Sequence, residues 1–212
     1  LSAFLVDEGA EVAIGARPDL DSHRVHVVYE LLMRAAISQD ISDEEIAALE
    51  AEKQDAARPR SQLRSMFLEG ATMSHRAWLR LNEERHAMYG KWREFFGRYD
   101  VLLCPVLATP AFPHDDRIPA WRTLAVNGIE MELGRQPFWA GYTGAFYLPS
   151  TVVPIGLSDA GLPLGCQIVG DQLDDLKCIR LARLLEARYR AFQPPPAFPA
   201  DMAQSGAKGA AA

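Results

Sequence analysis

Few residues in this chain have the types and spacing that chemistry requires. His23 and His26 stand three residues apart on a predicted helix, so both rings could face one metal ion, but no third ligand completes the set. His114 precedes Asp115 and Asp116 in a proline-rich stretch, where adjacent residues seldom orient each other as a catalytic His–Asp pair must. We therefore predict no metal site and, at His114, a solvated loop.

Serine and cysteine nucleophiles are no better supported. A nucleophilic serine usually stands in a glycine-rich turn, and the chain contains no Gly-x-Ser-x-Gly sequence. Ser150 opens a predicted strand without flanking glycines. Cys104, Cys166 and Cys178 lack metal-type spacing and a neighbouring activating base. The sequence thus predicts no catalytic residue within the chain, and reduced thiols that serve packing, as is typical of a cytoplasmic protein.

An aromatic segment is the best candidate for binding a ligand. It carries Phe138, Trp139, Tyr142, Phe146 and Tyr147. Gly141, Thr143 and Gly144 interrupt its periodicity, which favours an irregular segment at the edge of a sheet. Such segments often line apolar pockets. Packing in the core and lining a pocket both remain open for these side chains.

Short apolar runs predict the strands that position this segment. Residues 151–155 and 164–169 flank a Ser-Asp-Ala-Gly turn and predict two adjacent buried strands. Residues 101–106 form a continuous apolar run and predict a strand buried on both faces. An alternating strand is expected at 11–14, and the Asn127-Gly128 pair predicts a hairpin with a type I′ turn.

Helices are predicted between about residues 22 and 99 and again near the end. Asp21 or Ser22 can cap the first, and Ser42 with Glu45 forms a capping box. The longest helix, 74–99, carries one apolar face made of Trp78, Leu81, Met88, Trp92, Phe95 and Tyr99. A last helix, capped by Asp174, should turn inward the side chains of Leu176, Ile179, Ala182, Leu185 and Tyr189. Residues 201–212 should be disordered.

Composition excludes several classes of protein. The 212 residues are 49% hydrophobic and carry a net charge of -6, so the chain offers one sizeable core and no basic surface for nucleic acid or an anionic membrane. No apolar run approaches the roughly 20 residues of a membrane helix, and no signal peptide is visible. The first residue is Leu1 rather than Met, and the chain opens in an apparent helix, so we expect a truncated start.

Two motifs together resemble a known family. Residues 146–156 read Phe-Tyr-Leu-Pro-Ser-Thr-Val-Val-Pro-Ile-Gly, and residues 161–170 read Gly-Leu-Pro-Leu-Gly-Cys-Gln-Ile-Val-Gly. This resembles the C-terminal signature of the amidase signature enzymes, a Leu-Pro-Ala-x-x-x-Pro strand followed by Gly-Leu-Pro-x-Gly-x-Gln-x-x-Gly. The resemblance covers about residues 74–196. It implies an α/β fold, a mixed central β-sheet flanked by helices, with residues 1–200 forming the C-terminal part of a single amidase domain.

The resemblance also implies what the chain lacks. The family's serine, cis-serine and lysine triad belongs to an N-terminal portion with a Gly/Ser-rich stretch and an earlier lysine, and neither is present here. We expect the full protein, with that missing half as partner, to hydrolyse small non-peptide carboxamides through a serine acyl-enzyme, and this chain alone to be inactive. No cofactor or metal is implied.

The resemblance gives the aromatic segment a role. It suggests that the residues before Leu148 border the acyl side of the substrate pocket, so the expected substrate-binding residues are Phe138, Trp139, Tyr142 and Phe146. One departure is Tyr147, where the family often has glycine.

Two alternatives remain open. The same fold serves amidotransferase subunits that release ammonia from glutamine or asparagine for charged tRNA, although the absence of a basic surface disfavours this. A non-catalytic binding or assembly module derived from an amidase is the other. If this chain holds only part of the sheet, the exposed strand edges should also cause poor solubility or pairing of two copies into a homodimer.

Overall fold

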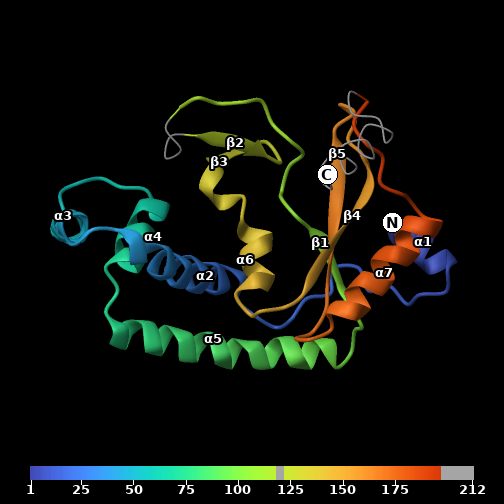
Figure 1. Cartoon of the computed structure of the whole chain (residues 1–212), viewed down its shortest axis with the longest axis horizontal. Helices are drawn as coiled ribbons and strands as arrows, with labels where there is room; N and C mark the ends of the chain where they lie inside the picture. Colours follow the sequence, from blue (N-terminus) through green and yellow to red (C-terminus); the bar gives the residue numbers. More distant parts are fainter. Residues whose placement is uncertain (118–121, 197–212) are drawn as a thin grey trace, which may run out of the picture.

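The computed structural model describes residues 1–117 and 122–196, which form a sheet region and a helical region (Figure 1). The sheet contains β1 (Leu102–Pro105), β4 (Ser150–Leu157) and β5 (Pro163–Val169), in the order β1-β5-β4. Both pairs are antiparallel, so parallel pairings of a mixed sheet are not among the described residues. The α/β class and these three predicted strands are confirmed.

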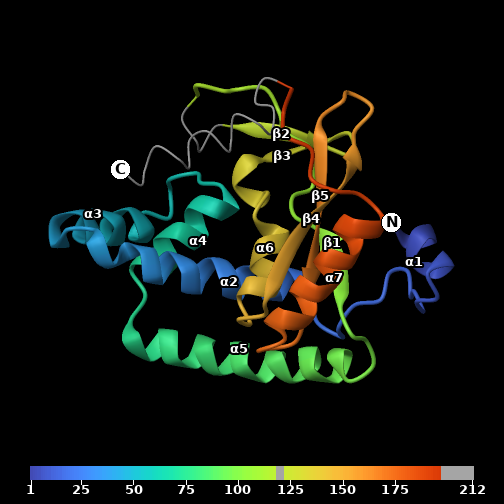
Figure 2. The same cartoon turned by 45° about the vertical axis from the view of Figure 1, so that its right-hand side comes forward.

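Two layers of side chains cover the sheet. On one face, α7 (Asp175–Arg188) crosses β4 and β5, as Figure 2 shows, and its Cys178 and Leu185 pack against Val153, Cys166 and Ile168. On the other, Cys104 and Val169 face the aromatic core. The burial predicted for these strands is only partly correct, because Val152 and Leu157 on β4 are exposed in the described chain.

The predicted hairpin is confirmed. β2 (Thr123–Val126) and β3 (Ile129–Glu132) pair in register around Asn127 and Gly128, whose φ angles are 52° and 79°. Positive φ at both central residues is the requirement of a type I′ turn, and asparagine and glycine meet it at least cost. The hairpin forms a sheet of its own, separate from β1, β4 and β5.

The helical region holds four of the longer helices. After α1 (Ser2–Asp7) come α2 (Ser22–Ile37), a 3₁₀ turn η1 (Ser38–Asp40), α3 (Asp43–Gln54), α4 (Gln62–Ala71) and α5 (His75–Phe96). A second 3₁₀ turn, η3 (Leu133–Arg135), precedes α6 (Phe138–Gly144). Every helix among the described residues is too short or too polar to cross a lipid bilayer.

Helices α2 and α3 begin at the capping residues that the sequence predicted. The Asp21 carboxylate accepts hydrogen bonds from the backbone amides of His23 and Arg24, at 2.9 and 3.3 Å. Ser42 and Glu45 form the predicted capping box.

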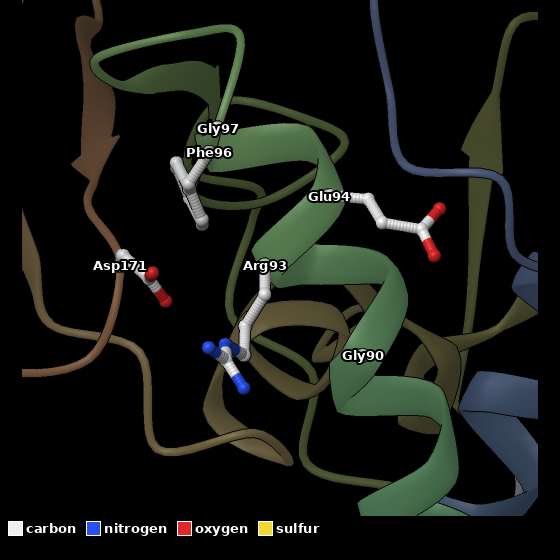
Figure 3. Close-up of a pocket in the computed structure, with 6 residues that line it drawn as sticks. All are labelled: Gly90, Arg93, Glu94, Phe96, Gly97 and Asp171. Carbon is white, nitrogen blue, oxygen red and sulfur yellow. The ribbon is translucent and has the colours of Figure 1, made fainter.

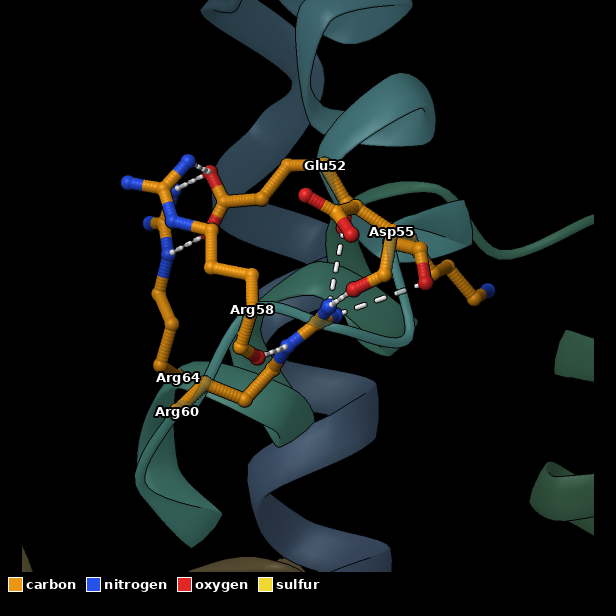
Figure 4. A network of polar contacts seen from close by, with 6 residues as sticks. Glu52, Asp55, Arg58, Arg60 and Arg64 are labelled. Atoms are coloured by element: carbon orange, nitrogen blue, oxygen red, sulfur yellow. Dashed lines mark hydrogen bonds and ion pairs between the residues drawn. The ribbon is translucent and has the colours of Figure 1, made fainter.

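The turn between α3 and α4 is held by arginines (Figure 4). Arg64 donates two hydrogen bonds to the Glu52 carboxylate, at 2.9 and 2.6 Å, and Arg60 donates to the backbone carbonyls of Glu52 and Asp55. The last carbonyls of a helix have no partner within the helix, and a cationic side chain at that end is favoured. Arg60 therefore stabilises the end of α3.

The apolar face predicted for the longest helix is confirmed. Leu81, Trp92 and Phe95 are buried along α5, which runs beneath both regions in Figure 1. Trp92 and Phe95 join α2 through Val25 and α6 through Tyr142 and form the centre of the aromatic core.

Two predictions of secondary structure or packing are wrong. Residues 11–14 form no strand: their alternation is not matched by hydrogen bonds to any strand among the described residues. On α7, Leu176 and Ile179 are exposed, while Leu185 lies inside as predicted. The reason is the helix period: Cys178, Ala182, Leu185 and Tyr189 form the stripe that packs on the sheet, and Leu176 and Ile179 point away from it. The predicted tail at 201–212 lies outside the described residues.

Candidate substrate-binding site

A cavity of about 1000 Å³ opens where three segments meet. Its walls come from α6, from residues 98–105 around β1, and from residues 9–17 after α1. Ligand pockets usually measure roughly 300–1,000 Å³ and are mostly apolar with a few polar groups. The cavity fits that description in size and lining.

The aromatic segment forms a helix rather than the irregular segment predicted, and this corrects our expectation. Phe138, Trp139 and Tyr142 of α6 all line the cavity, and Tyr142 lies three and four residues after the other two, the spacing at which helical side chains are neighbours. Phe138 stacks on Tyr142 with ring centroids 5.5 Å apart and meets Trp139 edge-on at 5.3 Å. The three rings thus form one rigid wall.

Gly141 explains why glycines occur within this helix. A Cβ placed there would lie 2.4 Å from the Tyr29 ring on α2, so only glycine lets the two helices approach this closely. Gly144, by contrast, faces open space. The glycines that seemed to interrupt the segment therefore include one that fixes it against α2.

Phe146 lies behind the cavity instead of lining it. Its side chain is 1% exposed and packs against Trp92, with ring centroids 6.0 Å apart. Three of the four expected substrate-binding residues thus line the cavity, and the fourth supports them from the core.

The residue that stands where the family often has glycine adopts a glycine-like backbone. Tyr147 has φ 57°, in the left-handed region that disfavours most side chains. Arg85 compensates, since its guanidinium lies 4.4 Å from the Tyr147 ring centre and donates a 2.8 Å hydrogen bond to the Ala145 carbonyl. Arg85 itself is buried.

Gln167 is a positioning residue that the sequence analysis did not single out. Its Nε2 donates to the Pro105 carbonyl at 2.8 Å and to the Trp139 carbonyl at 3.4 Å, and its Oε1 accepts from Ser150 at 3.0 Å. One buried amide therefore ties together β1, β4 and α6. A lone polar residue in the apolar run 164–169 is the feature that could have revealed it.

The histidines and acidic residues that the sequence offered as candidates do not come together into a site. His26 is half-buried with its ring 5.9 Å from that of Phe138, whereas His23 is exposed. Across residues 1–117 and 122–196 no group of three His, Cys, Asp or Glu side chains could hold a metal ion. His114 and Asp116 lie 3.3 Å apart and are both largely exposed, so the predicted solvated loop is confirmed.

A second hollow, of about 500 Å³, lies at the end of α5 (Figure 3). Arg93 and Asp171 project into it, and Tyr89 donates a 2.9 Å hydrogen bond to Asp171. The hollow is shallow, and its lining residues include no nucleophile and only one aromatic ring, that of Phe96. It is the weaker candidate for a substrate site.

The thiols are buried and free, as predicted. Burial raises the pKa of all three, that of Cys104 to about 12. We expect native protein to react with Ellman's reagent at least about tenfold more slowly than protein in denaturant, because the thiolate is the reactive form. Absorbance of the released thiol follows the rates, and one rapidly labelled native thiol would contradict this assignment.

Comparisons with known proteins agree with the fold and the motifs. The family model described as Amidase matches residues 3–179. A glutamyl-tRNA(Gln) amidotransferase subunit of Treponema pallidum (strain Nichols) is 32% identical over 88 residues, which make up 42% of this chain and 16% of that protein. A solved amidase structure, 22% identical, matches with a TM-score of 0.63 over 88% of this chain and 40% of its own.

A bacterial aryl acylamidase of the amidase signature family, 21% identical, matches with a TM-score of 0.54 over 87% of this chain and 39% of its own. The structural matches show a shared fold, and the chain spans well under half the length of each of these relatives. With the family model matching most of its residues, the chain belongs to the amidase family.

Proposed function

We propose that this chain is the C-terminal portion of an amidase that hydrolyses small non-peptide carboxamides to a carboxylate and ammonia or an amine. The observation that carries the proposal is the α6 wall: three aromatic rings from the segment next to the family motif line a cavity of about 1000 Å³. Phe138, Trp139 and Tyr142 contact the substrate, and Phe146 holds them in place from the core.

The acyl-enzyme chemistry comes from outside these 212 residues. The cavity lining contains Ser2 and Ser22 but no lysine, and no His among the described residues lies on it. A serine nucleophile needs an activating base within hydrogen-bonding reach. The triad and the oxyanion donors are therefore supplied by a polypeptide that completes the sheet, and the enzyme acts in the cytoplasm.

Expression of the chain alone and together with the polypeptide that the same reading frame encodes before Leu1 tests this function. Ammonia release from benzamide and from propionamide is measured for both proteins. We expect activity only when the two parts are present, with the KM of Trp139→Ala raised for benzamide. Activity of the isolated chain would overturn the placement of the catalytic residues, and an upstream sequence without a lysine and a Gly/Ser-rich stretch would overturn the amidase assignment.

A second candidate is the amidase component of a glutamyl-tRNA(Gln) amidotransferase. Its support is the sequence similarity, since relatives of that name are 32% identical over 88 residues and 31% identical over 121 residues. The acidic balance of this chain disfavours tRNA contacts through its own surface. Glutamine-dependent amidation of glutamyl-tRNA, measured with and without candidate partner subunits, separates the two functions, and failure of both assays leaves a non-catalytic assembly module.

A further inference from the structure

Two residues combine a strained backbone with a large apolar side chain that faces solvent. Within residues 1–117 and 122–196, the non-glycine residues with positive φ angles are Asn127 in the hairpin, Tyr147 at 57° and Leu173 at 71°. The side chains of Tyr147 and Leu173 are 69% and 93% exposed. The left-handed region costs an L-residue free energy that glycine does not lose, and an apolar side chain left in water contributes no burial in return. Both residues therefore hold their side chains outward at a cost to the fold.

The two residues lie on neighbouring turns that are bonded to each other. Tyr147 stands between α6 and β4, and Leu173 stands between β5 and α7. The side-chain amide of Gln172 donates a 2.8 Å hydrogen bond to the Phe146 carbonyl. Because this bond joins the residue before Tyr147 to the residue before Leu173, the two exposed side chains belong to one surface.

Both turns are also fixed to α5. The Arg85 guanidinium lies 4.4 Å from the centre of the Tyr147 ring and donates a 2.8 Å hydrogen bond to the Ala145 carbonyl. On the other turn, Asp171 accepts a 2.9 Å hydrogen bond from the Tyr89 hydroxyl of α5. A surface that is ordered in advance loses little conformational entropy when a partner binds.

Other exposed apolar side chains lack these features. Ile129 on β3 and Phe192 after α7 are 68% and 69% exposed, and neither has a positive φ angle. Single exposed apolar side chains are common on protein surfaces and need no special explanation. Leu176, which is 68% exposed on the first turn of α7, stands three residues after Leu173 and adds to the surface there. We call the group made of Tyr147, Leu173 and Leu176 the two-turn surface.

We propose that the two-turn surface is where the polypeptide that completes the amidase domain packs against this chain, through apolar side chains of its own. The solved amidase that matches 88% of this chain does so over 40% of its own length, so the larger part of that fold lies outside these 212 residues. That length of chain is the reason to choose the completing polypeptide over a second copy of this chain. The inference rests on the proposed function in taking this polypeptide as the occupant, and it adds the place where the polypeptide binds.

Glycine substitutions separate a binding role from a structural one. Leu173→Gly removes the side chain and relieves the backbone strain, so urea unfolding should show the 212-residue variant to be as stable as the parent or more stable. Each chain is also co-expressed with the polypeptide that the same reading frame encodes before Leu1, and dissociation of the complex on dilution is followed by sedimentation velocity. Leu173→Gly and Tyr147→Gly should each weaken the complex at least about tenfold, as is typical of an anchor residue. Ile129→Thr is the matched control, because it removes a similarly exposed apolar side chain elsewhere, and it should leave the complex unchanged.

Each outcome bears on a different claim. A complex that neither glycine substitution weakens, or no complex with the parent chain, would overturn the proposed surface. A marked loss of stability in Leu173→Gly would do the same, because the side chain would then serve the fold of the chain itself. Self-association of the chain alone that the glycine substitutions abolish would make a second copy the occupant and overturn the choice of partner. Ammonia release from benzamide by a complex that both substitutions leave intact would keep the amidase function and remove the surface, whereas a complex that both weaken but that releases no ammonia would keep the surface and remove the function.

Discussion

Replacing Trp92 by alanine is expected to lower the free energy of unfolding by about 3–5 kcal/mol, the usual cost of removing a buried large aromatic side chain. Trp92 is fully buried and lies between two helices that the cavity needs. Its ring meets Tyr142 edge-on at 5.3 Å and Phe146 at 6.0 Å, both from α6 or its end, and stacks on Phe96 at 5.7 Å. This loss of stability has two sources. The apolar surface of the ring is no longer buried, and the empty space that the ring leaves between the helices does not close.

Trp78 provides the matched control for this substitution. It stands on the same helix, α5, but is only partly buried and stacks on the neighbouring His75 ring at 6.4 Å. Trp78→Ala should therefore cost about 1 kcal/mol or less. Urea unfolding followed by far-ultraviolet circular dichroism measures both variants. Equal losses for Trp92→Ala and Trp78→Ala would show that the aromatic core does not hold α5 and α6 together.

Secondary-structure elements that depend on residues close together in the chain could be predicted from the sequence. The hairpin at Asn127-Gly128 follows from two residues that tolerate positive φ, and the start of α2 from the carboxylate of Asp21. The paired strands β4 and β5 follow from two apolar runs around a short turn. In each case the cause and the effect lie close together in the sequence.

Features that depend on contacts between segments far apart in the sequence could not be predicted from local patterns. Gly141 seemed to interrupt a helix because its contact with Tyr29 comes from another helix. Residues 11–14 alternate like a strand, yet alternation supplies no hydrogen-bonding partner. On α7 the stripe that faces inward includes Cys178 and not Leu176, and the sheet that selects this stripe is built from other segments of the chain.

The candidate site shows the same division. The aromatic wall was anticipated, because a family resemblance and a local cluster of rings both pointed to Phe138, Trp139 and Tyr142. The facing wall was not, since residues 9–17 lie far before Tyr142 in the sequence. Gln167 was overlooked because its three partners belong to three different segments.

Gly141→Ala is expected to destabilise the protein by about 1–3 kcal/mol, the usual cost of overpacking a close contact. The added methyl group would lie 2.4 Å from Cδ1 of Tyr29 and 2.8 Å from its Cγ. Because Cγ lies near the start of the side chain, rotating the ring cannot relieve the clash, and α6 must move away from α2. That movement shifts Trp139 and Tyr142, so benzamide binding should weaken together with stability.

Gly144→Ala on the same helix should act in the opposite direction. No atom lies within 4 Å of a Cβ at this position, and its φ is not in the left-handed region. Alanine is favoured over glycine in helices by up to about 1 kcal/mol, so this variant should be as stable as the parent or more stable. Urea unfolding measures the stability of the Gly141→Ala and Gly144→Ala variants, and titration with benzamide measures their binding. Equal destabilisation would mean that glycine is needed along α6 for its backbone freedom, whereas opposite signs would mean that contact with Tyr29 positions the aromatic wall.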